Sequence, residues 1–150
     1  MNAPAVFPFE HQNDIVIAAP AEAIFDYVTN PKSWPEWLPS SHEIMCDNRP
    51  MRFGDTFHEH WSTRSGPAEL DWVVIACDRP RLWIGLTFTQ FIGLIVVQYN
   101  CDPVSGGTRF TRTVRNPQRS KAISDEQFKN FDAEAKLGLN NIKTKIEARG

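Results

Sequence analysis

The stretch that most constrains this fold is the last one, residues 124–149, whose pattern predicts one long amphipathic helix. Apolar residues recur there at three- and four-residue steps, and most charged residues fall at other positions. Ser124 followed by Gln127 is a capping-box start, in which each side chain bonds a free backbone N–H at the other position. A helix of roughly 25 residues is about 37 Å long and needs a partner surface along its whole apolar stripe. The stripe consists of Phe128, Phe131, Ala135, Leu139, Ile142 and Ile146.

The segments before this helix are mostly of β type, so we expect a sheet to supply the partner surface. Residues 7–18 predict a first strand, and Pro20 opens a short helix at a position where its missing N–H costs little. A second brief helix is predicted over residues 32–38. It carries Trp34 and Trp37, which we interpret as structural plugs in preference to ligand contacts.

From Ser41 to Pro117, β-type runs alternate with turn residues, which predicts about six further strands joined by hairpins. Hairpins make antiparallel neighbours. The predicted fold is therefore α+β: a curved antiparallel sheet of about seven strands around the long terminal helix, with two short helices between the first and second strands. Residues 1–150 are expected to form one domain. The predicted turns lie at Asn48–Gly54, Ser65–Pro67, Asp78–Arg81, near Gly93 and at Ser105–Gly107.

Composition restricts the partners and the compartment. A net charge of −2 gives no reason to expect nucleic acid or an anionic membrane as a partner. Cys46, Cys77 and Cys101 have no CxxC spacing and are interpreted as reduced thiols, which favours the cytoplasm. Residues 1–6 lack the features of a signal peptide, and no apolar run is long enough to insert across a bilayer. No cofactor-binding fingerprint is present.

A curved sheet and a straight helix diverge at one end, so the space between them need not be filled. Large aromatic residues recur in the predicted strands, and they either complete the core or line a cavity. They are Trp61, Trp72, Trp83, Phe88, Tyr99 and Phe110. Gly138, inside the long helix, indicates close packing there, or else room for a ligand.

Three segments resemble one known family. Ile15–Trp37 resembles the opening of START-like (SRPBCC) proteins, in particular their polyketide cyclase/dehydrase-like branch. Leu70–Leu82 is similar to that branch's mid-sheet strand and proline turn, and Gly106–Arg112 to its last hairpin. The resemblance implies a helix-grip fold and an elongated cavity under the terminal helix. It implies no particular reaction, because the family includes lipid carriers, polyketide cyclases, hormone receptors and chaperone activators.

The strand Thr56–Ser62 alternates between two histidines on one face and Phe57, Glu59 and Trp61 on the other. His58 and His60 would need a third ligand to bind zinc, and no second cluster with ligand spacing appears, so we predict no metal. If the aromatic face is inward, Glu59 is a desolvated carboxylate and a candidate acid, base or ligand anchor. If the strand is a wet edge, Glu59 is solvated.

Arg112 is in phase with Phe110 and Val114, where the family pattern would place an apolar residue. A buried arginine needs an anionic or carbonyl partner, or else it extends along its stem to the rim. Tyr99 holds a ligand carbonyl or serves as a core tyrosine. The candidates for catalysis are Glu59, Arg112 and Tyr99; those for ligand binding are Glu59, Trp61, Trp72, Tyr99, Phe110, Arg112, Phe128 and Phe131.

Three functions fit this pattern. The leading one is binding or transport of a small hydrophobic or aromatic molecule, lipid-like or polyketide-like, in the cavity. The second is an aromatase/cyclase-like enzyme, in which Glu59 or a nearby histidine moves a proton α to a carbonyl. The third is a chaperone-activator-like interaction module, which predicts a filled core and an exposed apolar patch on the outer sheet face. The sequence leaves open whether the chain forms a homodimer.

Overall fold

The computed structural model describes residues 5–63 and 66–149. Ser65 of the predicted turn at Ser65–Pro67 lies outside the described residues, and so do residues 1–4 of the N-terminal stretch in which no signal peptide is predicted. The elements follow the predicted order of strand, short helices, strands and long helix. They are β1 (Phe9–Ile17), α1 (Ala21–Val28), the 3-10 turn η1 (Pro31–Ser33), α2 (Trp34–Trp37), β2 (Ser41–Met45), β3 (Thr56–Thr63), β4 (Gly66–Asp78), β5 (Leu82–Thr89), β6 (Gly93–Val104), β7 (Gly107–Asn116) and α3 (Asp125–Glu147).

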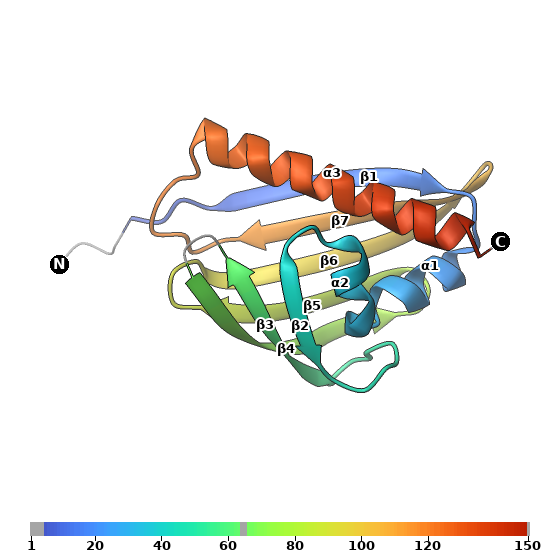
Figure 1. Ribbon diagram of the computed structural model, residues 1–150, viewed down its shortest axis with the longest axis horizontal. Coiled ribbons are helices and arrows are strands. Elements are labelled where there is room, and N and C mark those ends of the chain that lie inside the picture. Colours follow the sequence, from blue (N-terminus) through green and yellow to red (C-terminus); the bar gives the residue numbers. More distant parts are fainter. Residues whose placement is uncertain (1–4, 64–65, 150) are drawn as a thin grey trace.

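The strands form one antiparallel sheet of seven, in the order β1-β7-β6-β5-β4-β3-β2. The first and last strands along the chain are therefore neighbours, and β2 and β3 lie at the opposite edge. The register shifts between Val74 and Ala76, and such a bulge increases local twist and bending. Figure 1 shows the sheet curving beneath α3, which runs lengthwise above β1 and β7. The predicted helix-grip fold is confirmed.

The capping box that was predicted at the start of α3 is present. The Gln127 N–H donates to Ser124 Oγ at 3.1 Å, and the Ser124 N–H donates to Gln127 Oε1 at 2.9 Å. The residues buried along α3 begin only at Ala135 and continue to Ile146, so the helix is packed along its C-terminal half. Phe128, in the first turn, is 45% exposed, although the stripe predicted it to face the sheet.

The two short helices close the end of the concave face beneath the C-terminal half of α3 (Figure 1). Both tryptophans are held by hydrogen bonds: Trp34 Nε1 donates to the Val28 carbonyl at 3.0 Å, and Trp37 Nε1 donates to Ser33 Oγ at 3.1 Å. Each is almost fully buried. Trp37 agrees with the predicted structural plug, whereas Trp34 also lines a cavity on the concave side of the sheet.

The predicted strand aromatics divide between the two sheet faces. Trp83 is fully buried, and its Nε1 donates to the Met51 carbonyl at 3.1 Å. Phe88 was expected in the core or in a cavity wall, and this prediction is wrong: it is 60% exposed. The buried positions of β5 are Trp83, Gly85, Thr87 and Thr89, so strand alternation turns Phe88 to the outer face.

Candidate functional site

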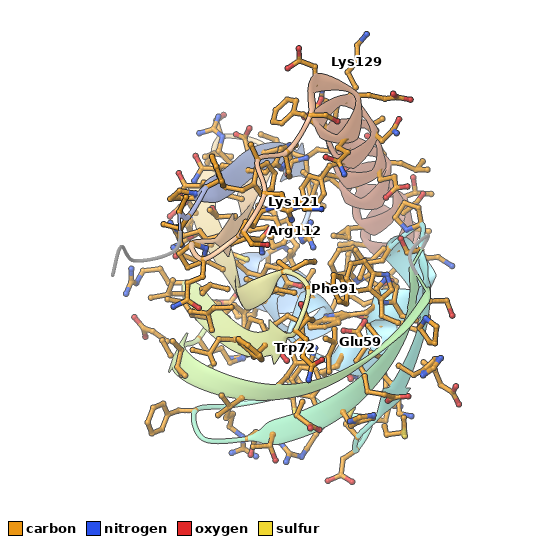
Figure 2. All side chains as sticks on the ribbon, turned by 90° about the vertical axis from the view of Figure 1, so that its left-hand side faces the viewer. Glu59, Trp72, Phe91, Arg112, Lys121 and Lys129 are labelled. Carbon is orange, nitrogen blue, oxygen red and sulfur yellow. The ribbon has the colours of Figure 1, made fainter. Side chains whose placement is uncertain are left out.

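A cavity of about 210 Å³ lies between the concave face of the sheet and the N-terminal half of α3. Its walls are mostly apolar and come from strands at both ends of the sheet and from the helix. They include Trp61, Trp72, Ile95, Val97, Phe131 and Ala135. Figure 2 shows Glu59, Trp72 and Arg112 within the space enclosed by the sheet and α3, whereas Lys129 points away from the molecule.

One wall of the cavity holds a buried carboxylate paired with a histidine. Glu59 is 2% exposed, on the inward face of β3, and it accepts a hydrogen bond from Trp72 Nε1 at 2.9 Å. Its other oxygen pairs with Nδ1 of His42 on β2. The His42 ring also stacks on Trp61, with centroids 5.8 Å apart and 9° between the planes. Glu59 therefore fixes the orientation of the imidazole.

The second imidazole nitrogen of His42, Nε2, has no hydrogen-bond partner among the residues that the structure describes, and the ring lines the cavity. A histidine whose Nδ1 is held by a carboxylate presents Nε2 as a proton acceptor or donor. This wall can therefore bind a polar ligand atom or exchange a proton with it.

The opposite wall holds Tyr99 on β6 and Arg112 on β7, which are direct cross-strand partners. Tyr99 is 1% exposed. Burial raises the pKa of its hydroxyl far above the ordinary range, the nearby Arg112 guanidinium lowers it, and the charge of Glu59 raises it further. The hydroxyl is therefore a protonated donor at neutral pH.

Arg112 forms no ion pair with the described residues, and its Nε atom is buried without a hydrogen-bond partner among them. Its guanidinium carbon lies 5.8 Å from the centre of the Trp37 ring, within the range of a cation–π contact. Since Arg112 lines the cavity, its charge faces the interior instead of being paired at the sheet surface.

The cavity brings together most of the residues that the sequence singled out. Those that line it are Glu59, Trp61, Trp72, Tyr99, Arg112 and Phe131. The structure places the other two elsewhere. Phe110 is fully buried against Tyr99, with ring centroids 5.5 Å apart, and Phe128 contacts Phe9 and His11 of β1 at the start of the helix, outside the cavity lining. Both are left out of the proposed site.

The face of β3 that the sequence left undecided is now fixed, with Glu59 inward. His58 and His60 are on the solvent side, where they pair with Glu69 and Asp71 across β4. The described residues contain no group of His, Cys, Asp and Glu placed to hold a metal ion. Within the same ranges, no helix is long and apolar enough to cross a membrane.

His42 is the main site residue that the sequence did not single out. The signal that could have found it is the β2–β3 hairpin, whose register sets His42 opposite Trp61 and Ile44 opposite Glu59. Diagonal neighbours on one face of such a pair are within reach of long side chains. The register itself could not be read from the sequence, because residues 46–55 separate the two strands.

A curved antiparallel sheet that encloses a cavity with a long terminal helix defines the helix-grip class of START-like proteins. Residues 9–147 match the family described as polyketide cyclase / dehydrase and lipid transport, and the chain belongs to that family. The match confirms the resemblance stated above. A comparison with curated proteins gives no match.

Solved structures share the fold at low sequence identity. The di-domain ARO/CYC StfQ from the steffimycin biosynthetic pathway aligns with a TM-score of 0.72 and 12% identity over 95% of this chain and 51% of that one. Protein Ms6760 from Mycobacterium smegmatis aligns with a TM-score of 0.70 and 18% identity, over 94% and 92%. Ara h 8.0201 aligns with a TM-score of 0.68 and 13% identity, over 95% and 99%.

Proposed function

We propose that this protein binds a small aromatic molecule of one or two rings in the cavity between the sheet and α3. The observation that carries the proposal is the cavity itself, whose walls are mostly apolar and include a smaller number of polar side chains. Ligand sites in proteins commonly have this composition. Membership of a family described by polyketide chemistry and lipid transport supports a hydrophobic ligand in general.

The size of the cavity narrows the class of ligand. An apolar cavity of about 150 Å³ accepts benzene, whereas sites for drug-sized molecules measure roughly 300–1,000 Å³. At about 210 Å³, this cavity favours one or two rings over a lipid chain or an extended polyketide. Trp61, Trp72 and Phe131 supply flat apolar surfaces, and burial contributes about 25 cal/mol per Å² of apolar area.

Thermal unfolding with and without 2-acetylnaphthalene tests the proposal. A ligand at 100 times its Kd stabilises the folded state by about 2.7 kcal/mol, which raises Tm by several degrees in a chain of this length. Native mass spectrometry of the freshly purified protein is the second readout, since a tightly held small molecule is retained. The absence of any shift with one- and two-ring probes, together with a ligand-free mass, would contradict the proposal.

The second candidate is an enzyme that uses the same cavity, and the pairing of His42 with Glu59 favours it. A general base must be oriented and must have a free nitrogen in the site, and His42 meets both conditions. Tyr99 and Arg112 on the opposite wall can donate to an oxygen that becomes negative as the proton leaves. The reaction class would be proton abstraction α to a carbonyl, the first step of an aldol-type ring closure.

The interaction-module function predicted a filled core, and the cavity does not favour it. Residence in the cytoplasm also stays a proposal. It is supported by the three free thiols of Cys46, Cys77 and Cys101.

A further inference from the structure

We propose that the ligand carries a carboxylate, and that Arg112 binds it together with Tyr99. The inference rests on the proposed function, since it names the chemical class of the molecule in the same cavity. Three observations carry it: a cluster of buried polar atoms without partners around Arg112, the absence of a carboxylate partner for Arg112 among the described residues, and the donor groups that Arg112 and Tyr99 offer.

The buried side-chain atoms without partners are concentrated at one place. Among the described residues, such atoms occur on His11, Asn13, Trp61 and Arg112. Three of these four residues are on β1 and β7, and Asn13 is the direct cross-strand partner of Arg112. Both polar atoms of the Asn13 amide, as well as Arg112 Nε, lack a partner. Native proteins rarely leave such atoms unsatisfied, so a missing polar group is expected beside them.

Arg112 has no carboxylate partner among the described residues, although two acidic and two basic side chains line the cavity, namely Glu59, Glu134, Arg112 and Arg119. The carboxylate of Glu59 is already taken up by His42 and by the Trp72 N–H. Within the described part of the chain, Arg112 forms no ion pair with either carboxylate. The Trp37 ring offsets only part of the cost of removing the arginine charge from water. An anionic ligand would give Arg112 the partner that it lacks.

The donors match a carboxylate in number and kind. Arg112 Nε–H and the Tyr99 hydroxyl belong to residues that line the cavity, and both donate, while two carboxylate oxygens accept several hydrogen bonds at once. Asn13 does not line the cavity and is the cross-strand partner of Arg112. Hydrogen bonds between a guanidinium and a carboxylate are shorter and stronger than neutral ones. The aromatic part of the ligand would then extend from this end of the cavity toward Trp61 and Trp72. Ordered water is the competing occupant.

A matched pair of probes separates these occupants. 2-Naphthoate and 2-acetylnaphthalene have nearly the same shape, but only the first is an anion, and benzoate with acetophenone repeats the pair on one ring. Titration calorimetry at constant pH and salt should show each carboxylate binding at least about tenfold more tightly than its neutral partner, which is about 1.4 kcal/mol.

Two substitutions test the residues. Arg112→Leu should abolish the preference for 2-naphthoate over 2-acetylnaphthalene, because the carboxylate loses its charged partner and the neutral ketone loses at most a weaker hydrogen bond. Asn13→Asp places a carboxylate opposite Arg112. This carboxylate should compete with the ligand for the arginine and weaken 2-naphthoate binding selectively, while Arg112 itself is retained. The matched control is Arg109→Leu on the outer face of β7, where Arg109 pairs with Asp14 at 3.1 Å. It should change neither affinity.

The outcomes are distinct. Equal binding of both probes in each pair, unaltered by Arg112→Leu or Asn13→Asp, would overturn this inference, leave the proposed function standing and assign the polar atoms to water. Failure of all four probes to bind would overturn the proposed function, and the inference with it. If Arg112→Leu does not fold by circular dichroism, Asn13→Asp alone decides, since it keeps the arginine.

Discussion

At the scale of single residues, His42 decides whether the cavity can do more than bind. Its Nδ1 is held by Glu59, which is itself held by the Trp72 N–H at 2.9 Å. A base fixed in this way is oriented before any ligand arrives, which is the geometric requirement for proton transfer. Binding alone does not need this arrangement, so an activity that depends on it is a sharp test.

The test is exchange of the α-hydrogens of the bicyclic ketone 1-tetralone in D2O, followed by proton NMR. His42 Nε2 takes the proton, the C–H electron pair moves into the enolate, and return of deuterium regenerates the ketone. Because general bases contribute typically 100-fold or more, we expect His42→Ala to slow the protein-catalysed exchange by about 100-fold. Glu59→Gln should also slow it strongly, because a glutamine whose oxygen accepts from Trp72 turns its NH2 group to His42 Nδ1 and so places the imidazole proton on Nε2.

The matched control is His60→Ala, because His60 is on the solvent face of β3 and pairs with Glu69. It should leave the exchange rate unchanged. If the wild-type protein exchanges the α-hydrogens no faster than buffer does, the enzymatic function is excluded for this class of ketone. If His42→Ala and the wild-type protein exchange them at equal rates, His42 is not the base.

At the scale of elements, the contact between α2 and α3 positions the helix above the sheet. A Cβ atom on Gly138 would lie 3.3 Å from the Trp37 carbonyl oxygen and 3.6 Å from its ring. The same carbonyl accepts a hydrogen bond from Asn141 Nδ2 at 3.1 Å. Gly138 therefore permits a close helix crossing, which agrees with the packing explanation and not with room for a ligand.

Gly138→Val should lower the free energy of unfolding by about 1–3 kcal/mol, because the branched side chain forces the two helices apart. Urea unfolding measures it. Gly138→Ala should change the free energy of unfolding by less than about 1 kcal/mol, because the gain in helix propensity offsets a tight contact. Leu137→Val, on the exposed side of the same helix, controls for β-branching. Equal effects of the two valine substitutions would contradict this account of the crossing.

Element by element, local patterns predicted most of the fold. The capping box located the start of α3, and turn residues separated the strands, since both signals depend on neighbours close in sequence. Burial was harder to predict. Phe128 continues the apolar stripe, yet the first turn of α3 is only partly covered because the packed length of the helix begins farther along. Where a helix meets its sheet is a property of the tertiary structure.

The site was only half predictable, for a related reason. Glu59 and Arg112 were found because each breaks an apolar alternation within its own strand. His42 and Asn13 have no such local signal. His42 depends on the register of a hairpin with a long connection, and Asn13 on the pairing of the first strand with the last. A single sequence does not encode either register in a local pattern.

At the scale of the whole molecule, one end of the enclosed space is packed and the other is hollow. Trp37 and the C-terminal half of α3 fill the first, and the cavity occupies the second, with Trp34 in its wall. The packed interior and the proposed ligand site therefore lie in different halves of one fold. A larger side chain in the cavity should therefore weaken ligand binding without lowering the free energy of unfolding. This outcome is expected where function requires an unfilled space.

Ala135 tests this division, because it is 8% exposed on α3 and lines the cavity. Ala135→Leu puts an isobutyl group into the cavity at almost no cost in helix propensity. We expect the affinity for 2-acetylnaphthalene to fall at least about tenfold, while added apolar burial keeps the free energy of unfolding unchanged or raises it by up to about 2 kcal/mol. Ala133→Leu, on the exposed side of the same helix, should alter neither quantity appreciably. Calorimetry and urea unfolding measure both. A loss of more than about 2 kcal/mol in Ala135→Leu would mean overpacking of a filled interior, and the hollow would not exist in solution.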